Sequence, residues 1–328
     1  MLRSLVGSEM CIRDSVTVVT GPEEYLFGEE KALLEVIEGN EPLPRWLPPF
    51  LHGLFATAPQ LGWESAESEP GHEAGHESNP TLVNNAETLA QAAWIVAHGA
   101  EAFRSLGTDE SPGTVVCTVV GDVLAPGVVE VPMGTPLRQV IDACGGVAEG
   151  RSVKAILPGV ANAVLTADQL DTPLTHEHFA AAGSGLGAAG FIVYDDSACM
   201  VAVSAMLSRF LYVESCGQCP PCKLGTGAIT EALDRIRTGD GRDADLDTIQ
   251  RRLQVVADGN RCYLPVQERE LISSFLRAFP EDVVAHLDGH CPSDRAELPV
   301  PKIVDLADGV VTYDARQMLK RPDWTYAD

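Results

Sequence analysis

Three cysteines stand at three-residue intervals in the stretch Cys216-Gly-Gln-Cys219-Pro-Pro-Cys222, and a fourth, Cys262, follows 40 positions later. A cubane iron–sulfur cluster needs one tight loop that turns three sulfurs toward a common point, and a fourth sulfur from elsewhere in the fold. This spacing supplies both, so it predicts a [4Fe–4S] site. Two alternatives stay open, namely a structural four-cysteine zinc site and a redox Cys-x-x-Cys pair.

The residues on either side of these cysteines show helical periodicity. It predicts four short amphipathic helices, at 199–211, 225–237, 244–257 and 266–279. Helices of this kind most simply pack as a four-helix bundle. The three-cysteine loop joins the first helix to the second, and Cys262 precedes the fourth. Alternating helices would therefore bring both cysteine loops to one end of the bundle.

The part of the chain before these helices is more varied. A period of two at 115–120 and 128–131, with a turn between, predicts a β-hairpin, and a helix at 136–143 and a strand at 191–194 complete a small α+β unit. Further upstream we expect a strand at 16–20, a helix at 29–38 and a helix at 85–106. Seven prolines keep 41–80 irregular, and 53–79 has the composition of a surface insertion.

Composition excludes several classes of protein. The 328 residues include 47 acidic and 23 basic side chains, and a formal charge of −24 repels nucleic acid and anionic lipid headgroups. The most apolar stretch, 198–213, is shorter than the roughly 20 residues that span a bilayer, so we expect no direct membrane span. Nine cysteines without a signal-peptide pattern argue against a disulfide framework and favour the reducing cytoplasm.

The first 15 residues, MLRSLVGSEMCIRDS, match neither signal-peptide nor transit-peptide grammar. They are similar to translated sequencing-adaptor sequence. We therefore expect residues 1–15 to be an artefactual or disordered leader, and the informative chain to start near Val16.

Several short motifs follow one another along the chain. They are Tyr25-Leu-Phe-Gly-Glu-Glu30, Leu47-Pro-Pro-Phe50, Val83-Asn-Asn-Ala-Glu-Thr88, Gly121-Asp-Val, Pro126-Gly127, Glu214-Ser-Cys-Gly-Gln-Cys-Pro-Pro-Cys222 and the lone Cys262. With them the chain resembles the NADH-binding flavoprotein (F) subunit of bacterial NADH-quinone oxidoreductase. It also resembles the diaphorase subunits of NAD-linked hydrogenases and formate dehydrogenases.

The resemblance implies an α+β multidomain fold. After the leader, it implies a partial α/β FMN and NADH domain at 16–110 with an insertion near 53–79, and a soluble-ligand-binding (SLBB-like) β-grasp domain at 111–196. A helical [4Fe–4S] domain at 197–288 and a C-terminal tail at 289–328 follow.

The resemblance also implies a chemistry. NADH would pass a hydride to FMN, and electrons would leave one at a time through the cluster bound by Cys216, Cys219, Cys222 and Cys262. The expected partners are a small [2Fe–2S] subunit and a larger iron–sulfur subunit. We expect a cytoplasmic protein, associated with a membrane through its partner subunits alone. A quinone complex, a hydrogenase and a formate dehydrogenase stay open as the final acceptor.

The resemblance assigns six residues to the FMN and NADH site: Tyr25, Gly28, Glu29, Glu30, Asn84 and Asn85. Glu30 is the catalytic candidate near the nicotinamide, and the two asparagines would donate to the flavin phosphate region. Spacing offers another interpretation, in which the two glutamates stabilise a helix N-terminus and Asn84 forms a capping box with Glu87. The two roles are compatible, because helix N-termini also bind phosphate.

We interpret most of the other motifs as having no catalytic or ligand-binding role. His72-Glu-Ala-Gly-His76 fits a zinc-peptidase pattern but sits among glycines and prolines, and Gly185-Leu-Gly187-Ala-Ala-Gly190 precedes a strand where a dinucleotide fingerprint would follow one. Cys117, Cys144 and Cys199 are interpreted as buried small apolar residues. Cys291, beside His290, is a candidate ligand without partners at a useful spacing.

An alternative function is that of a non-catalytic interaction module. In this case the chain would be a component of a redox complex, and a bound metal would only stabilise its fold. Its distinguishing mark would be zinc in place of iron, with no reducible chromophore.

Flavin content tests the FMN assignment. The glycine-rich flavin-phosphate loop of the family lies upstream of the Tyr25 segment, so we expect this chain to lack most phosphate contacts. The 328-residue chain, purified alone, should show iron–sulfur absorbance with little or no bound flavin. Stoichiometric FMN in the purified protein would contradict this expectation.

Overall fold

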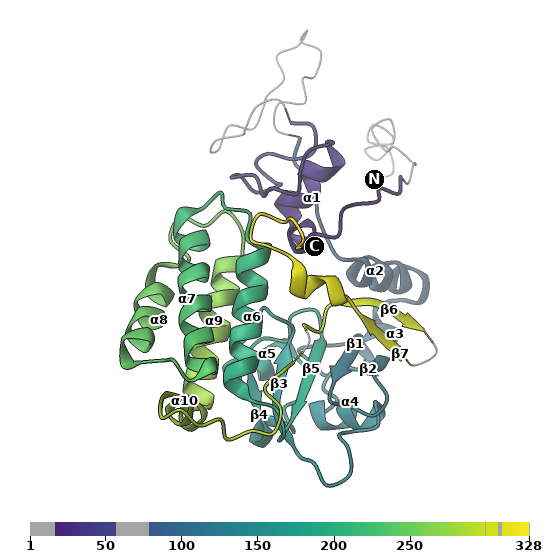
Figure 1. Ribbon diagram of the computed structural model, residues 1–328. Coiled ribbons are helices and arrows are strands. Elements are labelled where there is room, and N and C mark those ends of the chain that lie inside the picture. The colour runs from purple at the N-terminus through teal and green to yellow at the C-terminus, as the bar shows by residue number, and fades with distance from the viewer. Residues whose placement is uncertain (1–16, 57–78, 299, 308–309, 328) are drawn as a thin grey trace, which may run out of the picture. The chain divides into compact units, whose positions relative to one another are not determined.

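The computed structural model describes residues 17–56, 79–298, 300–307 and 310–327. The chain forms two compact units, Met1–Thr81 and Leu82–Asp328, and each is described by itself. The first contains one α-helix and one 3-10 helix among its described residues. The second contains a mixed sheet, a set of long helices and a C-terminal hairpin, as expected for an α+β chain (Figure 1).

In the first unit, the 3-10 helix η2 (Tyr25–Gly28) leads into α1 (Glu30–Ile37). The loop after α1 is held by Arg45, whose guanidinium lies 2.7 Å from the Glu35 carboxylate and 3.0 Å from that of Glu38. The same guanidinium donates to the carbonyl of Gly53 at 3.0 Å. A buried arginine with two carboxylates and a carbonyl thus closes a loop that its prolines keep irregular.

Two expectations for this unit have different outcomes. The helix expected at 29–38 is confirmed as α1. The strand expected at 16–20 is wrong over its described part, because 17–20 is exposed and pairs with no strand in the described chain. The zinc-peptidase-like motif at 72–76 and most of the insertion at 53–79 lie outside the described residues.

The second unit contains a five-stranded sheet in the order β2-β1-β5-β3-β4. Its strands are β1 (Thr114–Gly121), β2 (Gly127–Pro132), β3 (Val153–Pro158), β4 (Leu165–Thr166) and β5 (Gly190–Asp195). The predicted hairpin of β1 and β2 and the predicted strand β5 are confirmed, and β1 pairs with β5 in parallel. The helices α4 (Leu137–Ala143) and α5 (His176–Ala181) contribute Leu137 and Phe179 to the core of the sheet.

The long helices of the second unit follow the sheet in sequence. They are α6 (Met200–Glu214), α7 (Pro220–Thr238), α8 (Asp243–Val255), α9 (Leu264–Ala278) and α10 (Pro280–Leu287). Figure 1 shows α6 to α9 side by side, and residues such as Ile229, Leu233 and Ile272 form their shared core. α10 was not predicted, because Pro280 follows the expected end of a helix and instead starts a new one. Among the described helices, none has the length and apolarity of a membrane-crossing segment.

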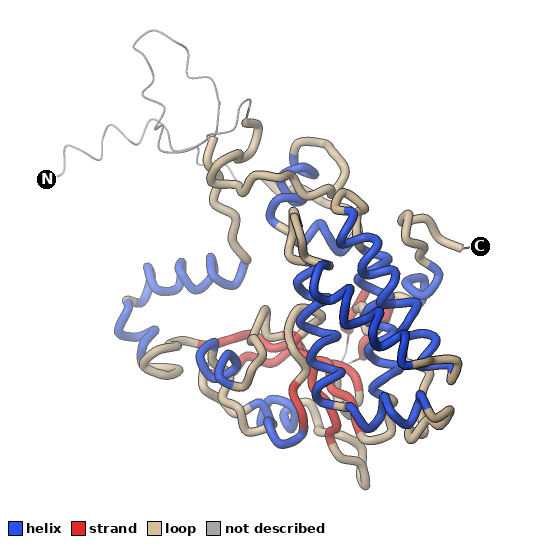
Figure 2. The backbone as a smooth tube through the Cα atoms, turned by 90° about the vertical axis from the view of Figure 1, so that its left-hand side faces the viewer, coloured by secondary structure: helices blue, strands red, loops and turns tan. Residues whose placement is uncertain are grey.

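Two further segments differ from expectation. The single helix predicted at 85–106 is divided into α2 (Ala86–His98) and α3 (Ala100–Arg104), since Gly99 between them has φ +90 (Figure 2). The expected C-terminal tail contains a hairpin of β6 (Ile303–Ala307) and β7 (Val310–Tyr313), and the 3-10 helix η4 (Ala315–Leu319).

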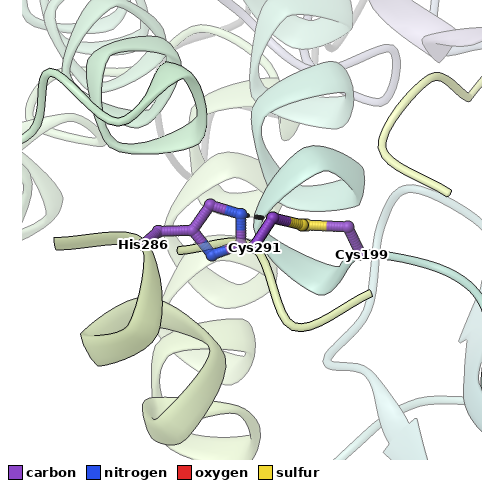
Figure 3. Close-up of side chains that lie close together, drawn as sticks. All are labelled: Cys199, His286 and Cys291. Carbon is purple, nitrogen blue, oxygen red and sulfur yellow. Dashed lines mark hydrogen bonds between the residues drawn. The ribbon is translucent and has the colours of Figure 1, made fainter. Parts of the chain in front are cut away.

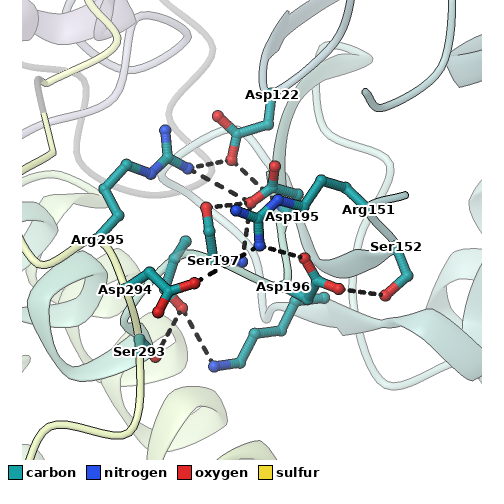
Figure 4. A network of polar contacts seen from close by, with 11 residues as sticks. Asp122, Arg151, Ser152, Asp195, Asp196, Ser197, Ser293, Asp294 and Arg295 are labelled. Carbon is teal, nitrogen blue, oxygen red and sulfur yellow. Dashed lines mark hydrogen bonds and ion pairs between the residues drawn. The ribbon is translucent and has the colours of Figure 1, made fainter. Parts of the chain in front are cut away.

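A network of charged groups joins the sheet to the segment after α10 (Figure 4). The Arg295 guanidinium contacts the Asp122 carboxylate, just after β1, and lies 3.8 Å from the carboxylate of Asp195 at the end of β5. Arg151 lies 3.3 Å from Asp196 and 3.7 Å from Asp294. Ion pairs therefore fasten the sheet to the segment that follows the last of these helices.

Gly121 tests the packing of β1 against β5. A Cβ at Gly121, where φ is +92, would lie 2.2 Å from the carbonyl oxygen of Val193, whereas one at Gly150, where φ is +80, would meet nothing within 4 Å. Gly150→Ala should therefore cost only the left-handed strain, about 1 kcal/mol. Gly121→Ala should cost about 1–3 kcal/mol more in the free energy of unfolding, because the overlap adds to the strain. Urea denaturation followed by circular dichroism measures both, and equal losses would show that the overlap has no cost.

Candidate metal centre

Three of the four cysteines of the predicted cluster lie at the starts of two helices, and Cys216 lies in the loop between α6 and α7. Cys219 is the N-cap residue of α7, and Cys222 lies in its first turn behind Pro220 and Pro221. Cys262 lies two residues before α9 begins. Proline suits the first turn of a helix, because its missing N–H would have no partner there. The Cys-Pro-Pro-Cys sequence thus starts α7 and presents thiols from its N-terminus.

The thiol of Cys222 is close enough to the other three to sense their charge. Burial raises the pKa of Cys222 strongly, and negative charge on Cys262, Cys219 and Cys216 raises it further. Cys222 is buried and the other three are half-buried. Four thiolates at one place repel one another unless a cationic centre binds them, and they are the donor set of a [4Fe–4S] cluster. The residues present therefore fit such a cluster, and the N-terminal ends of α7 and α9 favour its negative charge.

A lysine stands beside this donor set. The Nζ of Lys223 donates to the carbonyls of Tyr212, Ser215 and Pro322 at 3.2, 2.7 and 2.6 Å. Burial lowers the pKa of Lys223, and the thiolates of Cys222 and Cys216 oppose this by favouring its charged form. The lysine thus places a positive charge near the thiolates and ties their loop to the C-terminal segment.

Two other polar groups face the site. The side-chain amide of Gln218 donates to the Cys216 sulfur at 3.6 Å. Glu268 in α9 is fully buried, accepts from the Ser208 hydroxyl at 2.6 Å, and has its pKa raised to about 8 by burial. Burial thus favours the neutral form of Glu268, and its carboxyl is near enough to contribute to the raised pKa of Cys222.

A buried ion pair fixes the helix end that precedes the cysteine loop. The Glu214 carboxylate, at the end of α6, accepts from Lys320 Nζ at 2.9 and 3.0 Å and from the Gln317 amide at 2.7 Å. Both charged side chains are inaccessible to solvent, at 0 and 1% exposure. Arg209 of α6 also donates to the carbonyls of Met318 and Lys320. The C-terminal segment around η4 is thus a structural part of the metal centre.

The six residues assigned to the FMN and NADH site fall in two separate units. Tyr25, Gly28, Glu29 and Glu30 belong to the first unit, at the start of α1. A Cβ added to Gly28 would meet no atom within 4 Å, so the backbone there is open to approach. Glu30 lies in the first turn of α1, as the helix-dipole interpretation expects.

Asn84 and Asn85 belong to the second unit, before α2. The expected capping box of Asn84 with Glu87 is wrong, because Asn85 is the N-cap and its side-chain oxygen accepts from the Thr88 amide at 2.7 Å. Glu87 instead accepts from the amide of Val116 at 2.8 Å. The Nδ2 group of Asn85 is then the part of that side chain that can donate to a phosphate.

Sequence reasoning missed several residues of the centre. Lys223, Gln317 and Lys320 stand outside every quoted motif, and Glu214 stands at the start of one without an assigned role. The contacts of Glu214 with Gln317 and Lys320, and of Lys223 with Pro322, span about 100 positions. It also judged Cys291 to lack partners. In the structure Cys199, His286 and Cys291 come together near the start of α6, at the end away from the four cysteines.

Two family descriptions match the chain. Residues 202–286 match the "NADH-ubiquinone oxidoreductase-F iron-sulfur binding region", which covers α6 to most of α10. Residues 116–157 match the SLBB domain, which covers the first three strands of the sheet. Together they define the class of protein, one with an iron–sulfur binding region and an SLBB domain.

Two individual proteins are similar to the chain over most of its length. The chain is 35% identical over 282 residues to the NADH-quinone oxidoreductase F subunit, form 2, of Rhizobium meliloti (strain 1021), covering 84% of this chain and 62% of that one. It is 34% identical over 283 residues to the NADH-quinone oxidoreductase F subunit of Mycobacterium bovis (strain ATCC BAA-935 / AF2122/97), covering 85 and 59%.

A solved structure agrees. The H2-reduced NAD+-reducing [NiFe]-hydrogenase matches with a TM-score of 0.70 and 27% identity, over 90% of this chain and 47% of that one. The chain is similar to the NADH-quinone oxidoreductase F subunit over 84% of its own length, and its iron–sulfur region matches the description of that subunit, as the motifs indicated. It spans about three fifths of the length of these curated relatives.

Lys320 tests the contribution of the C-terminal segment. Lys320→Met leaves the Glu214 carboxylate buried without its counter-charge, which should cost about 3–5 kcal/mol in the free energy of unfolding and lower the iron retained per chain. The double variant Lys320→Met/Glu214→Gln removes both charges and should recover most of the loss. Denaturation curves and iron analysis measure these effects, and a stable Lys320→Met variant with full iron would contradict the role of the pair.

Proposed function

We propose that this chain is the electron-exit part of an NADH-oxidising subunit, in which Cys216, Cys219, Cys222 and Cys262 hold a [4Fe–4S] cluster. The observation that carries the proposal is the convergence of four thiols at the starts of α7 and α9, inside the region that matches the iron–sulfur binding description. The names of the relatives favour electron transfer over a metal-stapled interaction module.

Each part of the proposed site has a physical task. The bound flavin and cluster would supply the step from a two-electron hydride donor to one-electron transfer. The four cysteines hold the iron atoms, and Lys223 with the Gln218 amide offsets the negative charge of the reduced state. The Glu214–Lys320 pair keeps the end of α6, and with it the cysteine loop, in one position.

The FMN and NADH site remains part of the proposal. Tyr25, Gly28, Glu29 and Glu30 would line the nicotinamide and flavin pocket, with Glu30 as the catalytic candidate near the nicotinamide. Asn84 and Asn85 would bind the phosphate region. The open backbone at Gly28 supports close approach of a planar ring. The Nδ2 group of Asn85 supports donation to a phosphate.

The remaining assignments are proposed on the same basis. We place the domain boundaries at 110/111, 196/197 and 288/289, and assign α6 to α9 as the four-helix iron–sulfur bundle. Partner subunits follow from membership of a multi-subunit family, and we propose a small [2Fe–2S] subunit and a larger iron–sulfur subunit as the neighbours. A cytoplasmic location suits a cysteine-rich chain without a membrane-crossing helix in its described part.

Removal of one ligand tests the cluster assignment. Cys219→Ser should lower the low-temperature EPR signal of the reduced protein at least tenfold, because a hydroxyl is a poor substitute for a thiolate on iron. Cys144→Ala, which removes a buried cysteine from the sheet core, is the matched control and should keep the signal. An unchanged spectrum and iron content in Cys219→Ser would refute the ligand set.

A further inference from the structure

A second group of metal-ligand side chains lies at the other end of α6 (Figure 3). Cys199 is the N-cap residue of α6, His286 lies in α10, and Cys291 lies in the segment after α10. Their ligand atoms all lie within 4.8 Å of one another, and the Cys199 sulfur lies 3.4 Å from His286 Nε2. Three elements of the fold thus converge on one point.

The histidine is oriented as a ligand. Its Nδ1 lies 2.7 Å from the carbonyl oxygen of Asp282, one turn earlier in α10, so Nδ1 carries the proton and donates it. Nε2 then has its lone pair directed toward the two sulfurs. A backbone carbonyl that fixes the tautomer and ring orientation is the usual support of a metal-bound histidine.

The distance between Cys199 and His286 suits a small tetrahedral ion. With Zn–S near 2.3 Å and Zn–N near 2.0–2.1 Å, tetrahedral geometry places two sulfurs about 3.8 Å apart and a sulfur and a nitrogen about 3.6 Å apart. The observed 3.4 Å between Cys199 and His286 is close to this value. Two thiolates and one neutral imidazole also balance the charge of a divalent cation in a site where Cys199 and His286 are buried.

We propose that Cys199, His286 and Cys291 bind one Zn²⁺ ion, with water as the fourth ligand. The half-buried Cys291 side of the site gives water access. α6 separates this site from the four cysteines by its full length, about 22 Å for 15 residues. The zinc site is therefore distinct from the iron–sulfur site and has no part in electron transfer, since Zn²⁺ has no redox chemistry.

The ion would fasten the junction of sheet and helices. Beside the site, the amide of Cys199 donates to the carbonyl of Arg295 at 3.0 Å, and the Ala198 carbonyl accepts from Lys154 Nζ at 3.1 Å. Lys154 of β3 also lies 2.9 Å from the Asp282 carboxylate of α10. A metal bound here joins the start of α6, α10 and the segment 289–298 where these polar contacts already meet. Its role is structural.

When no metal is bound, burial disfavours the thiolate form of Cys199. Burial is the main cause that raises the pKa of Cys199 to about 11, and the nearby Cys291 contributes to this rise. The Cys199 sulfur would then be a thiol at pH 7, and the competing states are a thiol–imidazole hydrogen bond and a Cys199–Cys291 disulfide. The experiment has to distinguish zinc from both.

Metal analysis of the full chain provides the test. Protein purified anaerobically with its iron–sulfur cluster should contain about one zinc per chain beside the iron. Zinc K-edge X-ray absorption should show two sulfurs near 2.3 Å and nitrogen and oxygen near 2.0–2.1 Å, and it is blind to the iron site. His286→Gln and Cys291→Ser should each weaken zinc binding at least tenfold in competition with a chromophoric chelator.

Matched controls keep the outcomes separate. His290→Gln removes the neighbouring exposed histidine and should leave zinc affinity unchanged. Cys219→Ser should lose the EPR signal but keep zinc, whereas Cys291→Ser should lose zinc but keep the EPR signal, so either proposal can fail alone. If a variant does not fold, wild-type protein stripped by a chelator and reloaded with zinc chloride should regain its thermal stability. Folded wild-type protein that takes up no zinc, variants that bind it equally well, or a Cys199–Cys291 disulfide in the anaerobic protein would overturn the inference.

Discussion

Mutual repulsion among four clustered thiolates is the constraint on which the helical part of this protein depends. Cys222 is buried and senses the charge of Cys216, Cys219 and Cys262, so these groups stay together only if the surrounding structure holds them and a cationic centre neutralises them. The helix starts at α7 and α9 contribute the positive ends of two dipoles. Lys223 adds a full charge whose Nζ is held by three carbonyls.

The C-terminal segment is needed for the same reason. A loop that carries three thiols must start from a fixed position, and Glu214 provides it at the end of α6 through its buried pair with Lys320. A buried pair of this kind is weak support for stability by itself, but it is costly to break. The Glu214–Lys320 ion pair therefore holds the C-terminal segment in one position. Residues 317–322, part of what looks like a tail in sequence, contact Glu214 and Lys223 beside the metal centre.

The two ends of α6 have different tasks. Its C-terminal end leads into the loop with Cys216, Cys219 and Cys222, and its N-terminal end meets the sheet, α10 and the segment after it. Ion pairs of Arg295 and Arg151 and the Cys199–His286–Cys291 group lie at this second end. These contacts hold the start of α6 in a fixed position against the sheet.

The sequence by itself determined the local features. The Cys-x2-Cys-x2-Cys spacing and Cys262 indicated the cluster, alternating residues indicated β1 and β2, and apolar periodicity indicated four of the long helices, because each signal lies within a short window. It missed the break at Gly99, where a glycine inside an apolar helical pattern gave no clear boundary. It assigned the N-cap to Asn84, one residue early, because the two asparagines look alike in sequence.

Only the tertiary structure decided which distant residues meet. Lys320 and Glu214 are separated by 106 positions, and Cys199 and His286 by 87. No local pattern marks either pair, since their contacts arise from the packing of α6 against α10 and against the C-terminal segment. The sequence thus determined the ligands of the predicted cluster, and folding alone supplied the charges that hold its loop and the second group of metal-binding side chains.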